Sequence, residues 1–497
     1  NGRTILFDGE ELSPGFRKDR QTNQRLVAGA RGNWHDWNYT LAFAHGLNKL
    51  TLGETGGLTT NLWGRLFTES ELLQNPLDYS DETLSKIRSV VAPDRQLREV
   101  STQLTDINLT ASQKIGETDW GDVKLGTVIF SQRQKYDLNL LTPSAIEKPY
   151  YAKRAIGGGA MEIQVPAYEN LLLTGSLRVD KYSDFGSTAT GKAAFKYNVS
   201  GNTFIRGSVG SGFRAPTLTQ IHQLPSRINL SANNYEVYAQ GNPKLQPEKS
   251  QQMSFGFQRE ANPKLTYGAD LWQINLREAF GAWSVEQING DPMLKEKYFI
   301  DNPKGLDRYD IAPLNLGQML KRGIDYNIRL RHPMDHGRLW LIVEGTYNLK
   351  SDQSPYPDQG MMSDIGIYRN STNTFTPKNK IKFSSIWETA NYQIGASINY
   401  VSGNIENLPN NVLMVSTGNR VGAQYKNTIP AQWTLDVSGN YHINSSTKVR
   451  LTIQNLFNEK PPLRYSSLYS AGASQLTDTR YNNYYGSTVR MSIDHRF

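Results

Sequence analysis

Residues 484–497, YYGSTVRMSIDHRF, decide the fold class of this chain. Val489, Met491, Ile493 and Phe497 alternate with polar side chains, and His495 is the one polar residue on their face. Alternation with a period of two is typical of a β-strand whose two faces meet different solvents. We therefore expect a strand that presents apolar side chains to lipid and polar side chains to an enclosed, wet interior.

The composition of the whole chain fits such strands. Among its 497 residues, no run approaches the roughly 18 apolar residues that a membrane-spanning helix requires. A transmembrane β-barrel is not detected by a search for apolar runs, because half of the residues in each strand are polar. The 26 tyrosines and 9 tryptophans would supply aromatic girdles at the membrane surfaces. The chain has no cysteine, which excludes disulfides, thiolate zinc sites and thiol catalysis.

Similar alternation recurs along the chain and predicts roughly 17 strands. They fall at about 25–31, 38–49, 101–115, 122–136, 160–166, 171–181, 187–199, 203–213, 249–259, 265–280, 318–332, 338–349, 379–388, 391–402, 432–443, 446–457 and 484–497. With one exception, short turns alternate with long connections, as expected for periplasmic turns and external loops of an outer-membrane barrel. A sandwich or a propeller would not sort its connections in this way.

The odd number of predicted strands indicates that at least one strand is missing. The first segment, 25–31, and the last, 484–497, both run from the long-loop end toward the short-turn end, so they would pair in parallel. Bacterial single-chain barrels close with antiparallel pairs, and an open edge in hydrocarbon is costly. The opening Asn1-Gly2-Arg3 carries no signal peptide. We therefore expect material to be missing from the N-terminus.

Five blocks of sequence carry a resemblance to a known family. They are KYSDFGS at 181–187, GFRAPTL at 212–218, GNPKLQPEKS at 241–250, KRGID at 321–325 and QNLFNEKPP at 454–462. Together with the terminal Phe497, these blocks resemble, in order, the barrel of TonB-dependent outer-membrane receptors. The FRAP and NPKL blocks also have a structural interpretation, because Pro216, Pro243 and Pro247 each remove a backbone donor where a strand begins or ends.

The resemblance implies a particular organisation. The family has about 22 strands around an N-terminal plug, so residues 1–20 would be the remnant of an external loop and 21–497 a partial barrel, with the plug and first strands missing. It implies an all-β transmembrane antiparallel barrel in the outer membrane, in contact with lipopolysaccharide. Energy would come from the TonB–ExbB–ExbD complex through the missing N-terminal part.

The resemblance also predicts the kind of function. The protein would be a receptor and transporter of a small-molecule cargo, with no enzymatic activity, cofactor or nucleic-acid partner. The formal net charge of +8 favours an anionic cargo, so a ferric siderophore is the leading expectation. Haem, cobalamin, oligosaccharide or peptide uptake remains open. A passive or adhesive outer-membrane barrel without a plug, and a soluble all-β carbohydrate-binding protein or hydrolase, are the alternatives from other classes.

Candidate ligand-binding residues lie in the predicted external loops. Arg214 is placed either to brace a loop against a carboxylate or to contact cargo. His222 lies in the interval where haem-binding relatives carry a ligand, although a loop histidine with local partners is the simpler interpretation. An aromatic and basic cluster suited to an anionic aromatic chelate, or to lipid phosphates, comprises Arg464, Tyr465, Tyr469, Arg480, Tyr481 and Tyr484.

Two further motifs lack residues that their chemistry requires. Residues 186–192, GSTATGK, match the start of a phosphate loop, but Ala193 replaces the Mg²⁺-binding hydroxyl and a strand is predicted in place of a helix. His332 and His336 flank a turn and lack a partner glutamate, so we expect no metal site there.

Overall fold

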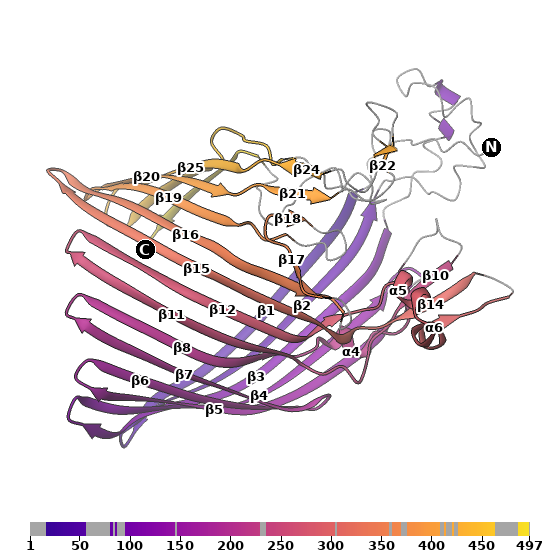
Figure 1. Ribbon diagram of the computed structural model, residues 1–497, viewed down its shortest axis with the longest axis horizontal. Helices are drawn as coiled ribbons and strands as arrows, with labels where there is room; N and C mark the ends of the chain where they lie inside the picture. Colours follow the sequence, from indigo (N-terminus) through magenta and orange to yellow (C-terminus); the bar gives the residue numbers. More distant parts are fainter. Residues whose placement is uncertain are drawn as a thin grey trace.

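The computed structural model describes residues 16–55, 80–82, 85–86, 95–144, 147–228, 235–303, 306–356, 360–368, 375–407, 412–413, 420–421, 426–462 and 486–496. Within them one sheet of 18 strands dominates, and each long strand pairs antiparallel with the next long strand along the chain (Figure 1). One of the 18, β17 (Met362–Ser363), has only two residues at one end of β16, which leaves 17 strands in the wall.

The 17 wall strands are, in chain order, β1 (Phe16–Trp34), β2 (Trp37–Thr55), β3 (Arg95–Thr118), β4 (Gly121–Leu140), β5 (Tyr150–Tyr168), β6 (Leu171–Tyr182), β7 (Gly186–Ser200), β8 (Thr203–Arg214), β11 (Glu248–Asn262), β12 (Leu265–Gly281), β15 (Leu314–Met334), β16 (Gly337–Ser354), β19 (Asn379–Glu388), β20 (Tyr392–Val401), β25 (Gln432–His442), β26 (Thr447–Gln454) and β27 (Thr488–His495).

The predicted strand count and the antiparallel all-β class are confirmed, but several strands are longer than predicted. The first strand was expected at 25–31, whereas β1 runs from Phe16 to Trp34 and takes in the end of the segment 1–20 that we assigned to an external loop. The reason is that strands continue beyond the membrane, where both faces are wet. There the apolar alternation disappears while the backbone ladder persists. Residues 186–192 lie in β7, so the phosphate-loop motif is part of a strand.

Apolar side chains form a continuous belt on the outer face of the sheet. In the last pair, Leu451 lies opposite Met491 and Ile453 opposite Val489. Val489, Met491 and Ile493 are 69%, 64% and 64% exposed, which excludes a dry core between two stacked sheets. None of the helices in the described parts of the chain is long and apolar enough to cross a membrane.

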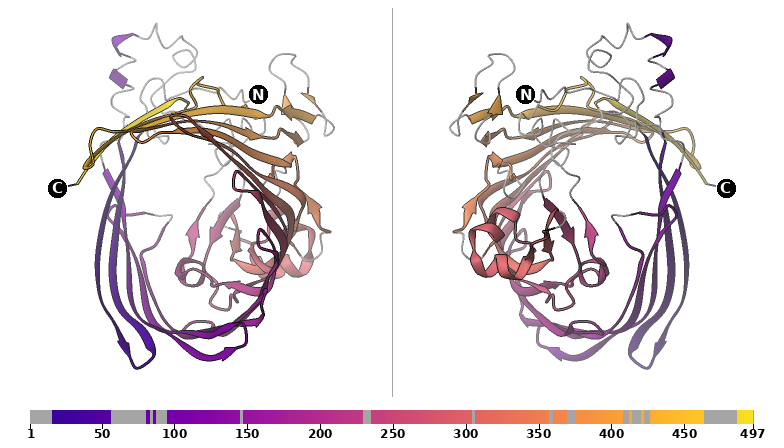
Figure 2. Two further views of the ribbon diagram at one scale, coloured as in Figure 1. Left: turned by 90° about the vertical axis from the view of Figure 1, so that its left-hand side faces the viewer. Right: turned by 90° about the vertical axis from the view of Figure 1, so that its right-hand side faces the viewer.

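The sheet curls around an interior, which Figure 2 views along two opposite directions. Short turns such as those at 35–36, 119–120 and 169–170 lie at one end of the wall, and the long connections lie at the other. Among the described residues, β1 pairs only with β2, and β27 pairs only with β26, so these two strands are the edges of the sheet.

Two long connections fold together at the open end of the wall. They contribute β9 (Ser226–Arg227), β10 (Tyr235–Ala239), β13 (Phe299–Ile300) and β14 (Asp307–Ile311), which form one four-stranded sheet, together with the short helices α5 (Val285–Gly290) and α6 (Pro292–Tyr298). Val237, Ile288 and Tyr309 form the core of this unit, which we call the mouth subdomain. Figure 1 shows it beyond the ends of the wall strands.

The remaining short elements also lie in long connections. They are α4 (Leu218–His222), β18 (Ile367–Tyr368), β21 (Asn404–Asn407), β22 (Val412–Leu413), β23 (Arg420–Val421) and β24 (Lys426–Ile429). Three of them, β18, β21 and β24, make a second small sheet.

Candidate functional site

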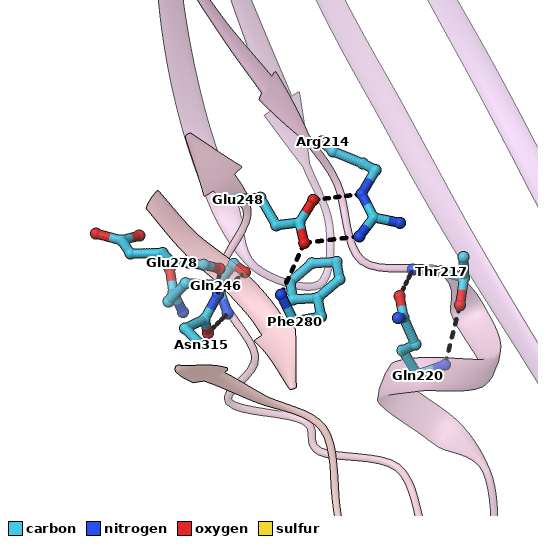
Figure 3. Close-up of polar contacts among 8 residues, drawn as sticks. All are labelled: Arg214, Thr217, Gln220, Gln246, Glu248, Glu278, Phe280 and Asn315. Atoms are coloured by element: carbon cyan, nitrogen blue, oxygen red, sulfur yellow. Dashed lines mark hydrogen bonds and ion pairs between the residues drawn. The ribbon is translucent and has the colours of Figure 1, made fainter. Parts of the chain in front are cut away.

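The segment that follows β8 turns away from the wall into a single helical turn. Pro216 is fully buried at the point where the strand ends, and proline cannot donate to a continuing ladder. Thr217 then caps α4: its hydroxyl accepts from the Gln220 backbone NH at 3.1 Å, and the Gln220 side chain accepts from the Thr217 NH at 2.9 Å (Figure 3). This capping box fixes the direction in which α4 leaves β8.

A buried arginine on β5 holds this segment against the wall. Arg154 is 4% exposed, and its Nη2 donates to the Pro216 carbonyl at 2.8 Å. Its Nε lies 3.2 Å from the Asp184 carboxylate, and its guanidinium lies over the Tyr182 ring. Tyr182 and Phe185 stack with ring centroids 4.3 Å apart. The SDFG and FRAP blocks therefore meet at one arginine.

A second arginine joins β8, β11 and β12. Arg214 makes a bidentate ion pair with Glu248, and the Phe280 backbone NH donates to the same carboxylate at 2.7 Å (Figure 3). The Glu248 side chain is only 3% exposed, whereas that of Arg214 is 60% exposed. The hydrogen bond from Arg214 to Glu248 raises the pKa of the guanidinium, which remains charged at any physiological pH.

The NPKL block ties the same loop to the connection before β15. The Gln246 NH donates to Asn315 Oδ1 at 2.9 Å, and Asn315 Nδ2 donates back to the Gln246 carbonyl at 2.7 Å (Figure 3). Asn242 Nδ2 donates to the Pro313 carbonyl at 2.9 Å, and Leu245 is fully buried. Backbone groups that leave the ladder are thus satisfied by amide side chains.

Between this braced segment and the inner faces of β1 to β5 lies a cavity of about 800 Å³, which we call the mouth cavity. That volume is in the range of small-molecule sites. Most of the residues on the wall side of the mouth cavity are of polar types and include Asn23, Arg25, Asn48, Gln132, Gln134 and Tyr136, while Ala215 to Thr219 form its other side. Such a surface can donate and accept hydrogen bonds.

Four charged residues line the mouth cavity, namely Asp106, Lys135, Arg154 and Arg25, and Arg25 is the cation that we single out. Among the described residues it makes no ion pair, and on β1 it lies opposite Gly46, on the strand face away from the belt residue Leu26. At the outer end of β5, burial raises the pKa of Tyr150, so its hydroxyl stays protonated. Tyr150 stacks on Tyr136 with centroids 5.3 Å apart. The mouth cavity thus combines cations, one carboxylate, amides and the aromatic ring of Tyr136.

The predicted site residues have different outcomes. Arg214 is engaged with Glu248, as the bracing interpretation predicted, and its contact with cargo stays a prediction. His222 is exposed in the last turn of α4. Within the described ranges, no group of three or more potential metal ligands is present. The aromatic and basic cluster lies outside the described residues: Arg464, Tyr465, Tyr469, Arg480, Tyr481 and Tyr484.

Sequence reasoning missed Arg154 and Arg25. Arg154 lies between the predicted strands 122–136 and 160–166, whereas β5 already begins at Tyr150. Its strand alternates exposed Tyr151, Lys153 and Ala155 with buried Ala152 and Arg154. Charged residues occupy both faces of this part of the strand, so the sequence shows no alternation of apolar and polar residues there. Only the alternation of exposed and buried positions, which the structure reveals, marks it as a strand.

The wall and its wet interior define an outer-membrane β-barrel. The model of the TonB dependent receptor-like β-barrel matches residues 3–456. The chain belongs to this family, whose barrels lie in the outer membrane and serve transport. No curated protein matches the chain.

Solved structures agree with the fold. The siderophore receptor PirA from Acinetobacter baumannii is 15% identical, with a TM-score of 0.65, and the match covers 96% of this chain and 63% of PirA. A mutant of the ferric enterobactin receptor PfeA from Pseudomonas aeruginosa, in complex with enterobactin, is 14% identical with the same TM-score and coverages. The RagAB peptide transporter is 13% identical, with a TM-score of 0.59, and the match covers 97% of this chain and 62% of that one. The chain thus spans less than two thirds of these proteins.

Proposed function

We propose that the whole protein is an outer-membrane receptor that imports a ferric siderophore with energy delivered by the TonB–ExbB–ExbD complex. The observation that carries this proposal is the mouth cavity, which is of small-molecule size and faces the interior of a family barrel. The cation Arg25 and the ring of Tyr136, which is stacked on Tyr150 outside the lining, suit an anionic, aromatic chelate. The likeness to PirA and PfeA supports the same cargo class.

In this proposal the braces set the shape of the mouth cavity. Arg154 and the Arg214–Glu248 pair hold the segment from Ala215 to Thr219 at a fixed distance from the wall. The receptor then binds cargo by a preorganised surface, which lowers the entropy lost on binding. The likeness to RagAB favours a peptide as the second candidate cargo.

A deletion strain tests the cargo class. We expect slower growth under iron restriction with at least one ferric siderophore as the iron source, and recovery when the complete gene is restored. Equal growth of both strains on every iron source, together with a defect on peptides as nitrogen source, would replace the siderophore by a peptide.

Substitution of Arg25 tests the mouth cavity. Arg25→Gln removes one charge-assisted hydrogen bond to an anionic cargo, so we expect affinity for the ferric siderophore to fall about tenfold. Arg20→Gln is the matched control, because Arg20 lies on the same strand but on the opposite face, opposite Thr51. Binding is measured by the quenching of protein fluorescence with the purified whole receptor. Equal affinity of the two variants would place the cargo elsewhere.

A further inference from the structure

Above the apolar belt, the outer face of β4, β5 and β6 carries a group of four cations. Arg133 and Lys135 lie on β4, Lys153 on β5 and Lys181 on β6. They alternate along their strands with inward-facing residues and share the face of the belt residues Ile129, Met161 and Val179, which are 67%, 53% and 55% exposed. We call these four residues the basic patch.

The basic patch is concentrated by the strand register. Lys135 lies directly opposite Lys153, Arg133 lies opposite Ala155, and Lys181 lies opposite Gly157. Like charges directly across an antiparallel pair are destabilising, so Lys135 and Lys153 disfavour this sheet unless an anion lies between them.

The protein provides little compensating negative charge there. In the described part of the chain, none of the four cations forms an ion pair. Asp137 is the acidic residue nearest along the same face, two positions beyond Lys135 and opposite Tyr151. Glu99 is already paired with Lys49 at 2.8 Å. The patch therefore keeps an excess of positive charge for an external ligand.

Below the cations the outer face lacks side chains along a narrow strip. Gly157 and Gly159 lie on β5 between the exposed rows of β4 and β6, with Ile129 and Val179 beside Gly159. A Cβ at Gly157 would meet only one backbone atom, the Phe130 carbonyl oxygen at 4.0 Å, so the space outside it is open. We call this strip the glycine lane. Ser131 and Lys181 flank it at Gly157, and the apolar Ile129 and Val179 flank it at Gly159.

We propose that the basic patch and the glycine lane together bind one phosphorylated lipid of the outer leaflet. The phosphate would lie between Lys135 and Lys153, with Arg133 and Lys181 beside it, and one acyl chain would follow Gly157 and Gly159 toward the belt. Two observations carry this assignment. The patch is positively charged, as a phosphate requires, and it lies next to the apolar belt, where the headgroups of the outer leaflet meet the acyl chains.

This site is separate from the proposed cargo site. Lys153 and Arg154 are adjacent on β5 but point to opposite faces, the first exposed and the second buried against the α4 segment. Lys135 is the member of the basic patch that also lines the mouth cavity, whereas Arg133 and Lys153 do not, so lipid binding can be lost at those two residues while cargo binding is kept.

The test uses the whole receptor, purified in detergent, and diphosphorylated lipid A as the probe. Since a cation near a lipid surface contributes about a fivefold gain in binding, Arg133→Gln with Lys153→Gln should weaken lipid A binding roughly 30-fold. Neither residue lines the mouth cavity. The control pair is Arg259→Gln with Lys264→Gln, at the opposite rim of the belt by the β11–β12 turn. Equal loss in both pairs, or in neither, overturns the proposal.

Two further arms separate lipid from anion. Gly157→Leu fills the glycine lane and leaves all four cations, so we expect weaker binding of lipid A and unchanged binding of inorganic phosphate. Dephosphorylated lipid A should bind the unmodified receptor about as weakly as lipid A binds the variant with Arg133→Gln and Lys153→Gln. If inorganic phosphate binds as tightly as lipid A, or Gly157→Leu binds lipid A normally, the lipid assignment is wrong. Circular dichroism and siderophore affinity verify that each variant is folded.

Discussion

Ile129→Arg is expected to destabilise the barrel in a bilayer by about 3 kcal/mol, because an arginine on the lipid face near the membrane midplane costs about 2–4 kcal/mol. Ile129 is 67% exposed on β4, between Leu109 of β3 and Gly159 of β5. An exposed isoleucine in a row of apolar partners has lipid as its solvent. The arginine would have to desolvate there or distort the bilayer around it.

The adjacent residue provides a matched control. Val128→Arg also replaces a β-branched aliphatic residue of β4, but Val128 faces the interior and lines a cavity of about 910 Å³. The new guanidinium can stay hydrated there, so we expect a loss below about 1 kcal/mol. Urea unfolding of each variant in lipid vesicles, followed by tryptophan fluorescence, measures the difference. A larger loss for Val128→Arg would reverse the assignment of the two faces.

The contrast between Ile129 and Val128 also shows which features of the fold the sequence could predict. In the belt, alternation identifies each strand and both of its faces, as at Val489, Met491 and Ile493, because lipid and water impose opposite demands on neighbouring residues. The strand order then follows from the chain order, since each long strand pairs with the next. This is why fold class and strand count were predictable without coordinates.

Beyond the belt the sequence carries less information. β1 begins nine residues before the predicted 25–31. The side chains from Lys18 to Gln24 are exposed on both faces of the strand, so nothing enforces alternation there. The mouth cavity was not predictable, because Arg25 and Arg154 are brought to it by the curvature of the sheet from strands far apart in the chain. The FRAP and NPKL blocks predicted a brace but not that Glu248 supplies it.

Removal of Glu248 is the second large effect that we expect. Its buried carboxylate accepts from Arg214 and from the Phe280 NH, and thereby holds three strands at the mouth. In Glu248→Ala the Phe280 NH loses its acceptor and the charge-assisted bond is lost. Because Arg214 is largely exposed and can be rehydrated, we expect a loss of about 3 kcal/mol rather than the higher values for fully buried pairs.

A nearby glutamate is the control for this change. Glu278 pairs with Lys249 at 3.1 Å, but the two side chains are 40% and 64% exposed, so Glu278→Ala should cost less than about 1 kcal/mol. Glu248→Gln keeps an acceptor for the Phe280 NH and loses the charge, so its stability should fall between those of the unmodified protein and Glu248→Ala. Urea unfolding midpoints in micelles rank the three variants. If Glu278→Ala proved as damaging as Glu248→Ala, surface charge and not the buried carboxylate would hold the mouth together.

If instead the ranking holds, affinity for cargo should fall together with stability only in the Glu248 variants. The reason is that the carboxylate fixes the end of β8, from which Pro216 and α4 extend to form one side of the mouth cavity.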